Sequence, residues 1–373
     1  MTPARRRSIP FFDYPQLFTA EEEMLVAILR DTGRRGAFIL QQDLARFEHN
    51  LARFLGARHA LGVANATDGL LIALRAAGIG PGDAVIFSSH TMVATAAAIH
   101  FAGATPVPVE CGPDHLIDPQ AVAWVVTSRT RAILPTHLNG RTADMAALQT
   151  IADRHGLAII EDAAQALGSR FRGQCAGTFG AAAAISFFPA KILGCLGDGG
   201  AVVTNDDKVY GRALQLHDHG RDASGEIVSW GFNSRLDNLQ AAILDARLRQ
   251  LGAILDRRRA LARLYRARLE NLDLLRLPPG PDGDADHFDV YQNYEIEAVR
   301  RDELKAHLEA CGIGTAVQWG GKAVHQWEKL GFREKLPFTE KLFEQILLLP
   351  LSMAVTDDEV NIVCDAIQAF YRG

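Results

Sequence analysis

The sequence predicts an α/β fold, in which a mainly parallel sheet is sandwiched by helices and is followed by a smaller C-terminal α/β domain. Strand-like and helix-like segments alternate regularly between residues 59 and 188. Such alternation is typical of parallel sheets with helices on both faces. The length of 373 residues favours two domains, because single hydrophobic cores rarely grow to this size.

The domain boundary is expected along a long helical segment at residues 236–269. The clearest change in composition follows it, in the loop PPGPDGDADHF that begins at Pro278. We therefore expect a large domain with an N-terminal arm at residues 1–250 and a small domain at residues 251–373.

The first half of the chain supplies the elements of the large domain. Prolines interrupt the arm at residues 1–15, and helices are expected at 19–31, with Thr19 as the N-cap, and at about 41–55. Strands alternating with helices are then expected at 59–64, 84–89, 105–110, 131–137, 157–162 and 181–188.

The second half predicts a long helix and then a smaller unit. The arginine-rich later part of helix 236–269 is interpreted as a solvated face rather than a nucleic-acid or membrane surface. A strand at 289–297, a helix at 301–312 and a strand at 315–319 follow. The last helix opens with Thr356 and Glu359 at capping-box spacing.

The composition is that of a soluble globular protein, with 48% hydrophobic and 22% charged residues. A net charge of −5 does not favour nucleic acid or anionic membranes as partners. The five cysteines form no pair with metal-ligand spacing, so we expect reduced thiols and no metal site. No signal peptide or membrane-spanning segment is expected, and a cytoplasmic location follows.

One lysine stands at the mouth of a predicted buried strand. Lys191 follows the strand that ends at Phe188 and precedes a loop containing Gly194, Gly197 and Gly199. An amine in this position suggests a Schiff base with an aldehyde cofactor. A surface lysine in a polar loop is the alternative.

Two further groups follow strands of the same predicted sheet. Asp162 ends a buried strand, where a carboxylate needs a cation such as a protonated pyridine nitrogen. Ser186 and the helix start at Asn65–Thr67 offer a hydroxyl and free N–H groups to a phosphate. A helix cap or a salt bridge explains each group singly. Together with Lys191 they predict pyridoxal 5′-phosphate.

The motifs SFFPAKILGCLGDGG, IEDAAQALGS, GVANATDGL, PTHLNGR and GFNSRLDNLQAAIL resemble those of the DegT/DnrJ/EryC1/StrS sugar aminotransferases. The resemblance begins near Phe11 and covers nearly the whole chain. It implies the fold of fold-type I enzymes that use pyridoxal phosphate. By this resemblance Lys191 carries the cofactor, Asp162 pairs with its pyridine nitrogen and Gln165 lies near its phenolic oxygen. The phosphate is assigned to Ala66, Thr67 and Ser186, and to Asn233 contributed to a neighbouring subunit of a homodimer with shared active sites.

The chain departs from the family pattern beside the cofactor. Family members often have an aromatic residue stacked on the pyridine ring where this chain has Met92. A thioether can also lie against a ring. Ile192 replaces the asparagine that commonly follows the lysine, and Ala66 and Gly69 replace a glycine and an alanine.

The function implied is transfer of an amino group from an amino acid, expected to be L-glutamate, to a nucleotide-linked 3- or 4-keto sugar. The amino sugar would serve a surface polysaccharide or a glycosylated product. A PLP-binding regulatory or structural protein with little turnover is the alternative, suggested by Met92. A third hypothesis is a lyase or aldolase that uses the same cofactor.

The segment VQWGGKAVHQW at residues 317–327 is the candidate substrate segment. Trp319 offers a flat face, Lys322 a charge and His325 a hydrogen-bonding ring, and family members place a pocket segment ending in histidine here. We expect these three residues to hold the nucleotide sugar. Alternatively, Trp319 and Trp327 belong to the core of the small domain and Lys322 is solvated.

Overall fold

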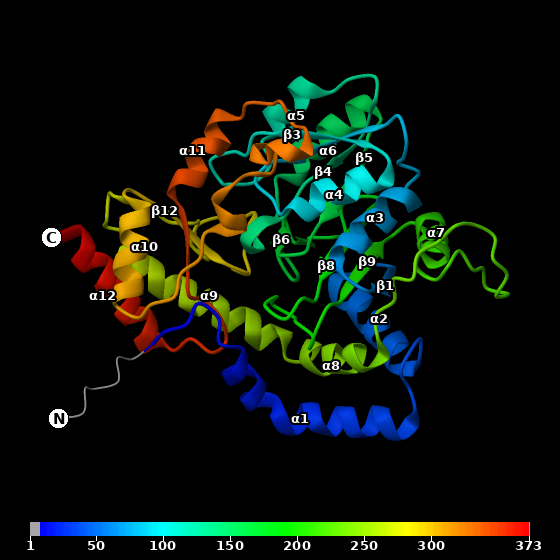
Figure 1. The fold of residues 1–373 in the computed structure, drawn as a ribbon, viewed down its shortest axis with the longest axis horizontal. Coiled ribbons are helices and arrows are strands. Elements are labelled where there is room, and N and C mark those ends of the chain that lie inside the picture. The colour runs from blue at the N-terminus through cyan, green and yellow to red at the C-terminus, as the bar shows by residue number, and fades with distance from the viewer. Residues whose placement is uncertain (1–7, 373) are drawn as a thin grey trace.

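A seven-stranded sheet forms the centre of the computed structural model, which describes residues 8–372 (Figure 1). The strand order is β1-β9-β8-β5-β4-β2-β3, and only β9 runs antiparallel to its neighbours. The predicted mainly parallel sheet is therefore confirmed. Its strands are β1 (His59–Val63), β2 (Ala84–Ser88), β3 (Thr105–Val109), β4 (Thr130–Leu134), β5 (Ala158–Asp162), β8 (Ala182–Ser186) and β9 (Gly200–Thr204).

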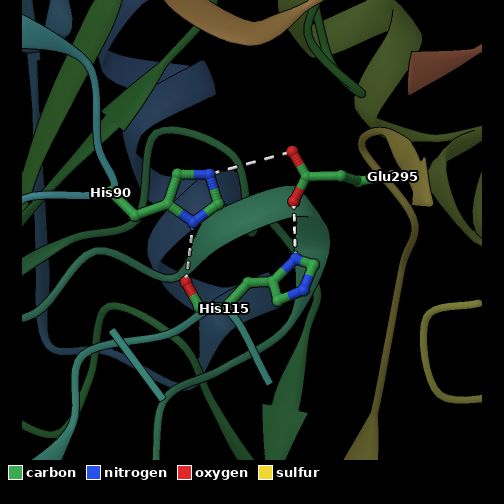
Figure 2. A group of neighbouring side chains, drawn as sticks. All are labelled: His90, His115 and Glu295. Carbon is green, nitrogen blue, oxygen red and sulfur yellow. Dashed lines mark hydrogen bonds and ion pairs between the residues drawn. The ribbon is translucent and has the colours of Figure 1, made fainter. Parts of the chain in front are cut away.

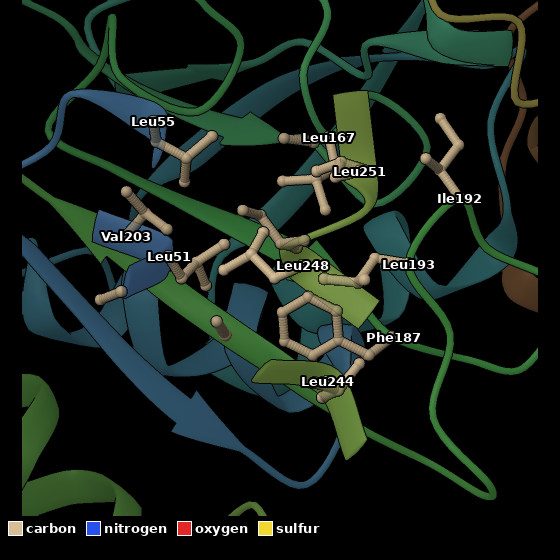
Figure 3. Packing of buried hydrophobic residues seen from close by; sticks show 14 of the residues in the cluster. Leu51, Leu55, Leu167, Phe187, Ile192, Leu193, Val203, Leu244, Leu248 and Leu251 are labelled. Carbon is tan, nitrogen blue, oxygen red and sulfur yellow. The ribbon is translucent and has the colours of Figure 1, made fainter. Parts of the chain in front are cut away.

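Helices cover both faces of this sheet because side chains alternate between its faces. In β9, Val203 joins the hydrophobic cluster under α2 and α8 (Figure 3), whereas Val202 joins the cluster under α3, α4 and α7. Burying both faces explains why the strands are apolar throughout. The helices of this part are α2 (Gln42–Leu55), α3 (Ala66–Ala76), α4 (Val93–Ala102), α5 (Pro119–Val125), α6 (Met145–His155), α7 (Asp207–His217) and α8 (Asn238–Leu248).

The C-terminal part has its own antiparallel sheet, in the order β10-β12-β13. Ile9 of the N-terminal arm packs into the same core and forms a bridge with Ile313. The elements of the C-terminal part are α9 (Leu251–Leu269), β10 (Leu275–Arg276), β12 (Tyr294–Ala298), α10 (Arg301–Ala310), α11 (Pro337–Gln345), β13 (Ile346–Leu349) and α12 (Asp357–Arg372). A third small sheet consists of β6 (Arg170–Phe171), β7 (Gln174–Cys175) and β11 (His287–Phe288). Short 3-10 turns lie at Leu138–Gly140, Gln318–Gly321, Val324–Gln326 and Glu328–Leu330.

The N-terminal helix starts earlier than expected. The helix α1 (Tyr14–Arg35) begins at a cap formed by Asp13, with Pro15 in its first turn. Proline fits this position because the N–H groups of the first turn have no acceptor within the helix. Thr19 is therefore inside the helix and is not its cap. Residues 1–7 of the predicted arm lie outside the described residues.

The predicted helix at 236–269 is two helices, α8 and α9, because the chain turns at residues 249–250. The interpretation of its arginines as solvated is wrong for two of them. Arg258 and Arg259 are buried and donate to the backbone carbonyls of Tyr291 and Asp289, each at 2.8 Å. They fasten α9 to the chain segment that leads into β12.

The predicted strand at 315–319 is also wrong: one bridge, Ala316 to Leu348, is followed by a 3-10 turn. The capping box is confirmed, since Thr356 and Glu359 exchange hydrogen bonds between side chains and backbone. Among the described residues, no helix combines the length and the apolar character needed to cross a membrane.

Candidate active site

A cavity of about 330 Å³ lies where β1, β4, β5 and β8 end. Parallel α/β sheets bind ligands at this edge. The structure brings most of the predicted cofactor residues to the wall of this cavity. From the predicted set, the lining contains Ala66, Thr67, Met92, Asp162, Gln165, Ser186, Lys191 and Trp319.

Lys191 lies in a tight turn after β8, where its backbone N–H donates to the carbonyl of Phe188 at 2.8 Å. The chain folds back so closely that a Cβ on Gly194 would lie 2.5 Å from the carbonyl oxygen of Pro189. Burial lowers the pKa of the Lys191 amine, and the negative charge of Asp162 partly opposes this shift. A lowered pKa increases the neutral fraction of the amine, which is the form that can bond to an aldehyde.

Asp162 is buried at the end of β5, and its carboxylate accepts hydrogen bonds from a backbone N–H and from the hydroxyls of Thr95 and, at 3.5 Å, Thr136. Thr95 Oγ1 donates to Oδ2 at 2.8 Å, and the backbone N–H of Ala164 donates to Oδ1 at 3.1 Å. Thr95 is in turn bonded to Thr91, whose hydroxyl also contacts that of Thr136, both at 2.9 Å. The hydroxyl chain fixes a carboxylate in the cavity wall.

The neighbouring carboxylate has a different environment, because Glu161 points to the opposite face of the sheet. It is fully buried and accepts backbone N–H bonds from Gly177, Phe179 and Gly180, each at 2.7 Å. His137 Nε2 lies 2.9 Å from Oε2, the carboxylate oxygen that also accepts the N–H of Gly177. These bonds satisfy Glu161 internally, so it is a structural group, whereas Asp162 borders the cavity.

The N-terminus of α3 forms one end of the cavity. Asn65 caps the helix by accepting the N–H of Asp68 at 2.9 Å, so the cap interpretation of Asn65 is correct. The first N–H groups of a helix have no partner within it, and Ala66 and Thr67 border the cavity at this point. A Cβ on Gly200 would lie 2.6 Å from the carbonyl carbon of Asn65. Only glycine lets β9 approach the start of α3 so closely.

Gln165 is connected to the C-terminal part through a residue that the sequence did not single out. Its Oε1 accepts the backbone N–H of Asn139 at 2.8 Å. Asn139 has a left-handed backbone, with φ of 55°, and its side chain bonds to Glu295, Asn293 and Gln318 at 2.9, 2.9 and 2.8 Å. The dipeptide Asn-Gly at 139–140 was the available sequence signal, because these residues favour left-handed turns.

The candidate substrate segment is divided between cavity and core. Trp319 and Met92 line both the first cavity and a neighbouring one of about 380 Å³, which Lys322 also lines. Lys322 Nζ lies 5.3 Å from the ring centre of Trp327. His325 is buried beneath this surface and bonds to Ser89 at 2.7 Å, so it supports the segment from behind.

Asn233 lies apart from the first cavity of its own chain. It is exposed and lines a further cavity of about 540 Å³ with Ile39 and Arg235. Asp198 borders both this cavity and the first one. The two spaces are therefore neighbours along the lysine loop.

The residues of the first cavity fit pyridoxal phosphate. An amine with a lowered pKa, a fixed carboxylate and a helix N-terminus match the aldehyde, the pyridinium nitrogen and the phosphate of that cofactor.

Comparison with known proteins agrees with this geometry. The sequence model of the DegT/DnrJ/EryC1/StrS aminotransferase family matches residues 19–368 of this chain. The chain belongs to this family. A dTDP-3-amino-3,4,6-trideoxy-alpha-D-glucose transaminase of Streptomyces venezuelae is 41% identical, over 96% of this chain and 95% of the relative. A protein of Geobacillus stearothermophilus named pleiotropic regulatory protein is 39% identical, over 98% and 99%. The crystal structure of S. venezuelae DesV has a TM-score of 0.94 and 40% identity, covering 98% of this chain and 99% of that one. This family is PLP-dependent, and the protein is an aminotransferase.

Proposed function

We propose that this aminotransferase moves an amino group from L-glutamate to a nucleotide-linked 3- or 4-keto sugar, in the synthesis of an amino sugar for a surface polysaccharide or a glycosylated product. The observation that carries the proposal is the meeting of Lys191, Asp162 and the α3 N-terminus in one cavity. The nucleotide-sugar substrate is supported by the relative from S. venezuelae, which is named as a dTDP-sugar transaminase.

Two residues would carry the chemistry. Bound pyridoxal phosphate supplies an aldehyde that takes up the amino group and a ring that accepts electron density from the substrate carbon. Lys191 would hold the aldehyde, and its Nζ would then move a proton to and from the substrate carbon. Asp162 would hold the proton on the pyridine nitrogen, with Thr95 keeping its carboxylate in place.

The other cavity residues would position the cofactor. Ala66 and Thr67 present the first turn of α3, and Ser186 adds a hydroxyl, so we assign the phosphate to these three. Gln165, held by the backbone of Asn139, would face the phenolic oxygen. The exposed thioether of Met92 would cover the ring in place of an aromatic side chain.

The nucleotide sugar would lie over the second cavity. Lys322 offers the positive charge that a diphosphate needs, and the half-buried ring of Trp319 forms a wall shared with the cofactor cavity. We assign His325 a role in holding this segment, because its ring bonds to Ser89 beneath it.

We also propose a cytoplasmic homodimer in which Asn233 completes the phosphate site of the partner subunit. Phe38, Ile39 and Trp230 have exposed fractions of 58%, 40% and 96%, and exposed apolar side chains of this size favour a protein interface. The proposed domain boundary near residue 250 lies slightly before the change of core along α9, since Leu251 and Leu255 pack with the large sheet and Leu261 packs with the small one.

The test is an amination assay with the purified holoenzyme. L-Glutamate carrying ¹⁵N is supplied with a panel of dTDP- and UDP-linked 3- and 4-keto sugars, and the products are analysed by mass spectrometry. We expect ¹⁵N in one amino sugar together with 2-oxoglutarate, and neither product with Lys191→Ala. A holoenzyme that releases no 2-oxoglutarate with any keto sugar would favour the regulatory alternative.

A further inference from the structure

Three ligand-type side chains meet at the junction between the large sheet and the C-terminal part (Figure 2). His90 follows β2, His115 lies in the loop after β3, and Glu295 belongs to β12. One nitrogen of each histidine and a carboxylate oxygen all lie within 4.8 Å of one another. None of the three lines the cofactor cavity.

The His90 ring presents a lone pair to the carboxylate. Its Nδ1 lies 3.1 Å from the carbonyl oxygen of His115. A carbonyl only accepts, so Nδ1 carries the hydrogen and Nε2 carries the lone pair. Nε2 is buried and has no hydrogen-bond partner among residues 8–372. Its charged neighbour is Glu295 Oε2 at 3.8 Å. Two facing lone pairs in a buried site are unfavourable unless a cation lies between them.

Three of the four ring nitrogens in the cluster have hydrogen-bond partners: both nitrogens of His115 and Nδ1 of His90. His115 Nδ1 lies 2.8 Å from Glu295, and its Nε2 lies 3.0 Å from Glu297. Histidines that bind metals usually direct the second ring nitrogen to a carbonyl or a carboxylate, as both His90 and His115 do here. Gln318 donates to Glu295 at 2.6 Å and further fixes its carboxylate.

A charged His115 bridging the two carboxylates is the alternative explanation without an ion. It accounts for both nitrogens of His115, but it leaves His90 Nε2 facing Glu295 with no proton between them. A cation bound by all three groups accounts for every atom of the cluster.

The separations suit a small divalent ion. With Zn–N and Zn–O bonds of about 2.0–2.1 Å, ligand atoms of a tetrahedral Zn²⁺ lie roughly 3.3 Å apart. The two separations from the Glu295 carboxylate, 2.8 Å from Oε1 to His115 Nδ1 and 3.8 Å from Oε2 to His90 Nε2, bracket that value. A cavity of about 350 Å³ lined by His115 and Glu295 gives access to the cluster and space for a water molecule.

We propose that His90 Nε2, His115 Nδ1 and the Glu295 carboxylate bind one Zn²⁺ ion, with water as the fourth ligand. The ion joins loops of the large sheet to β12 of the small one. It also fixes Glu295, which holds the side chain of Asn139 and thereby the turn that contacts Gln165. The ion has a structural role, because its ligands do not border the cofactor cavity.

The test uses the holoenzyme after treatment with EDTA. Zn²⁺ is titrated by calorimetry, the thermal midpoint is measured with and without Zn²⁺, and Co²⁺ is added to look for visible bands of a tetrahedral site. We expect one tight Zn²⁺ per chain, a raised midpoint and those bands. His90→Asn removes a ligand and should weaken Zn²⁺ binding by about 100-fold or more, beyond the roughly 10–100-fold that loss of an outer-shell partner costs, and Glu295→Gln should do the same.

His90→Asn is the decisive variant, because Nε2 has no hydrogen-bond partner to lose within the described part of the chain and the asparagine amide can still donate to the His115 carbonyl. His307→Asn is the matched control, since it disrupts the exposed His307–Cys311 pair, whose Nε2 and Sγ lie 3.8 Å apart and could hold an adventitious ion. Unchanged binding in His90→Asn, binding lost only in His307→Asn, or no tight Zn²⁺ in the wild type would each overturn the proposal.

Discussion

Replacing Asp162 by asparagine should separate activity from stability. The asparagine amide has the same shape as the Asp162 carboxylate, and its oxygen can still accept the N–H of Ala164. Its nitrogen would face Thr95 Oγ1, which can accept instead of donating because hydroxyls rotate. We therefore expect a loss of at most about 1 kcal/mol in the free energy of unfolding, the value of one ordinary hydrogen bond.

The rate should fall much further, because an amide cannot keep the pyridine nitrogen protonated. Loss of one such electrostatic partner typically costs about 10²–10³ in rate, or roughly 2.7–4 kcal/mol. The assay is the single-turnover half-reaction with L-glutamate, followed by the release of 2-oxoglutarate, with unfolding measured in parallel by denaturant.

Glu161→Gln is the matched control on the same strand. Its amide would replace a fully buried carboxylate that accepts three backbone N–H bonds and contacts His137. Breaking a buried charged network costs about 3–5 kcal/mol of stability, so this variant should lose stability first. The reasoning is refuted if Asp162→Asn stays within a few-fold of the wild-type rate, or if it destabilises the protein as much as Glu161→Gln does.

Three further outcomes are expected. Lys322→Ala should raise KM for the keto sugar and leave the glutamate half-reaction nearly normal; equal losses in both half-reactions, or none, would remove Lys322 from the substrate site. Gly200→Ala should weaken cofactor binding, measured as a higher Kd for pyridoxal phosphate, because a Cβ would come within 2.6 Å of the Asn65 carbonyl carbon and shift the start of α3; an unchanged Kd would contradict the assigned phosphate site. Mixing Asn233→Ala with Lys191→Ala chains should restore partial activity if Asn233 acts across subunits, and no recovery would place each site within one chain.

The sequence predicted the large sheet well because its strands are buried on both faces and read as continuous apolar runs. It did not predict β9, a short GAVVT segment directly after the glycine-rich lysine loop. It also merged α8 with α9, since the apolar stripe continues through Arg249 and Gln250, where neither glycine nor proline marks the break.

The candidate site was predictable where a residue ends a strand, as Asp162 does, or lies in the loop directly after one, as Lys191 does. Support for these residues was harder to foresee, because it comes from distant segments. The cluster of His90, His115 and Glu295 spans more than two hundred positions without a spacing motif. The absence of cysteine spacing had predicted no metal site, and only the fold brings these three residues together.

The most direct test of the central claim is chemical mapping of the cofactor. The purified holoenzyme is treated with borohydride, digested and sequenced by mass spectrometry. The account predicts one pyridoxyl-phosphate group, attached to Lys191 Nζ, and loss of the holoenzyme absorption in the visible region on reduction. A label on any other lysine, or no label on a chain that retains its cofactor, would contradict it.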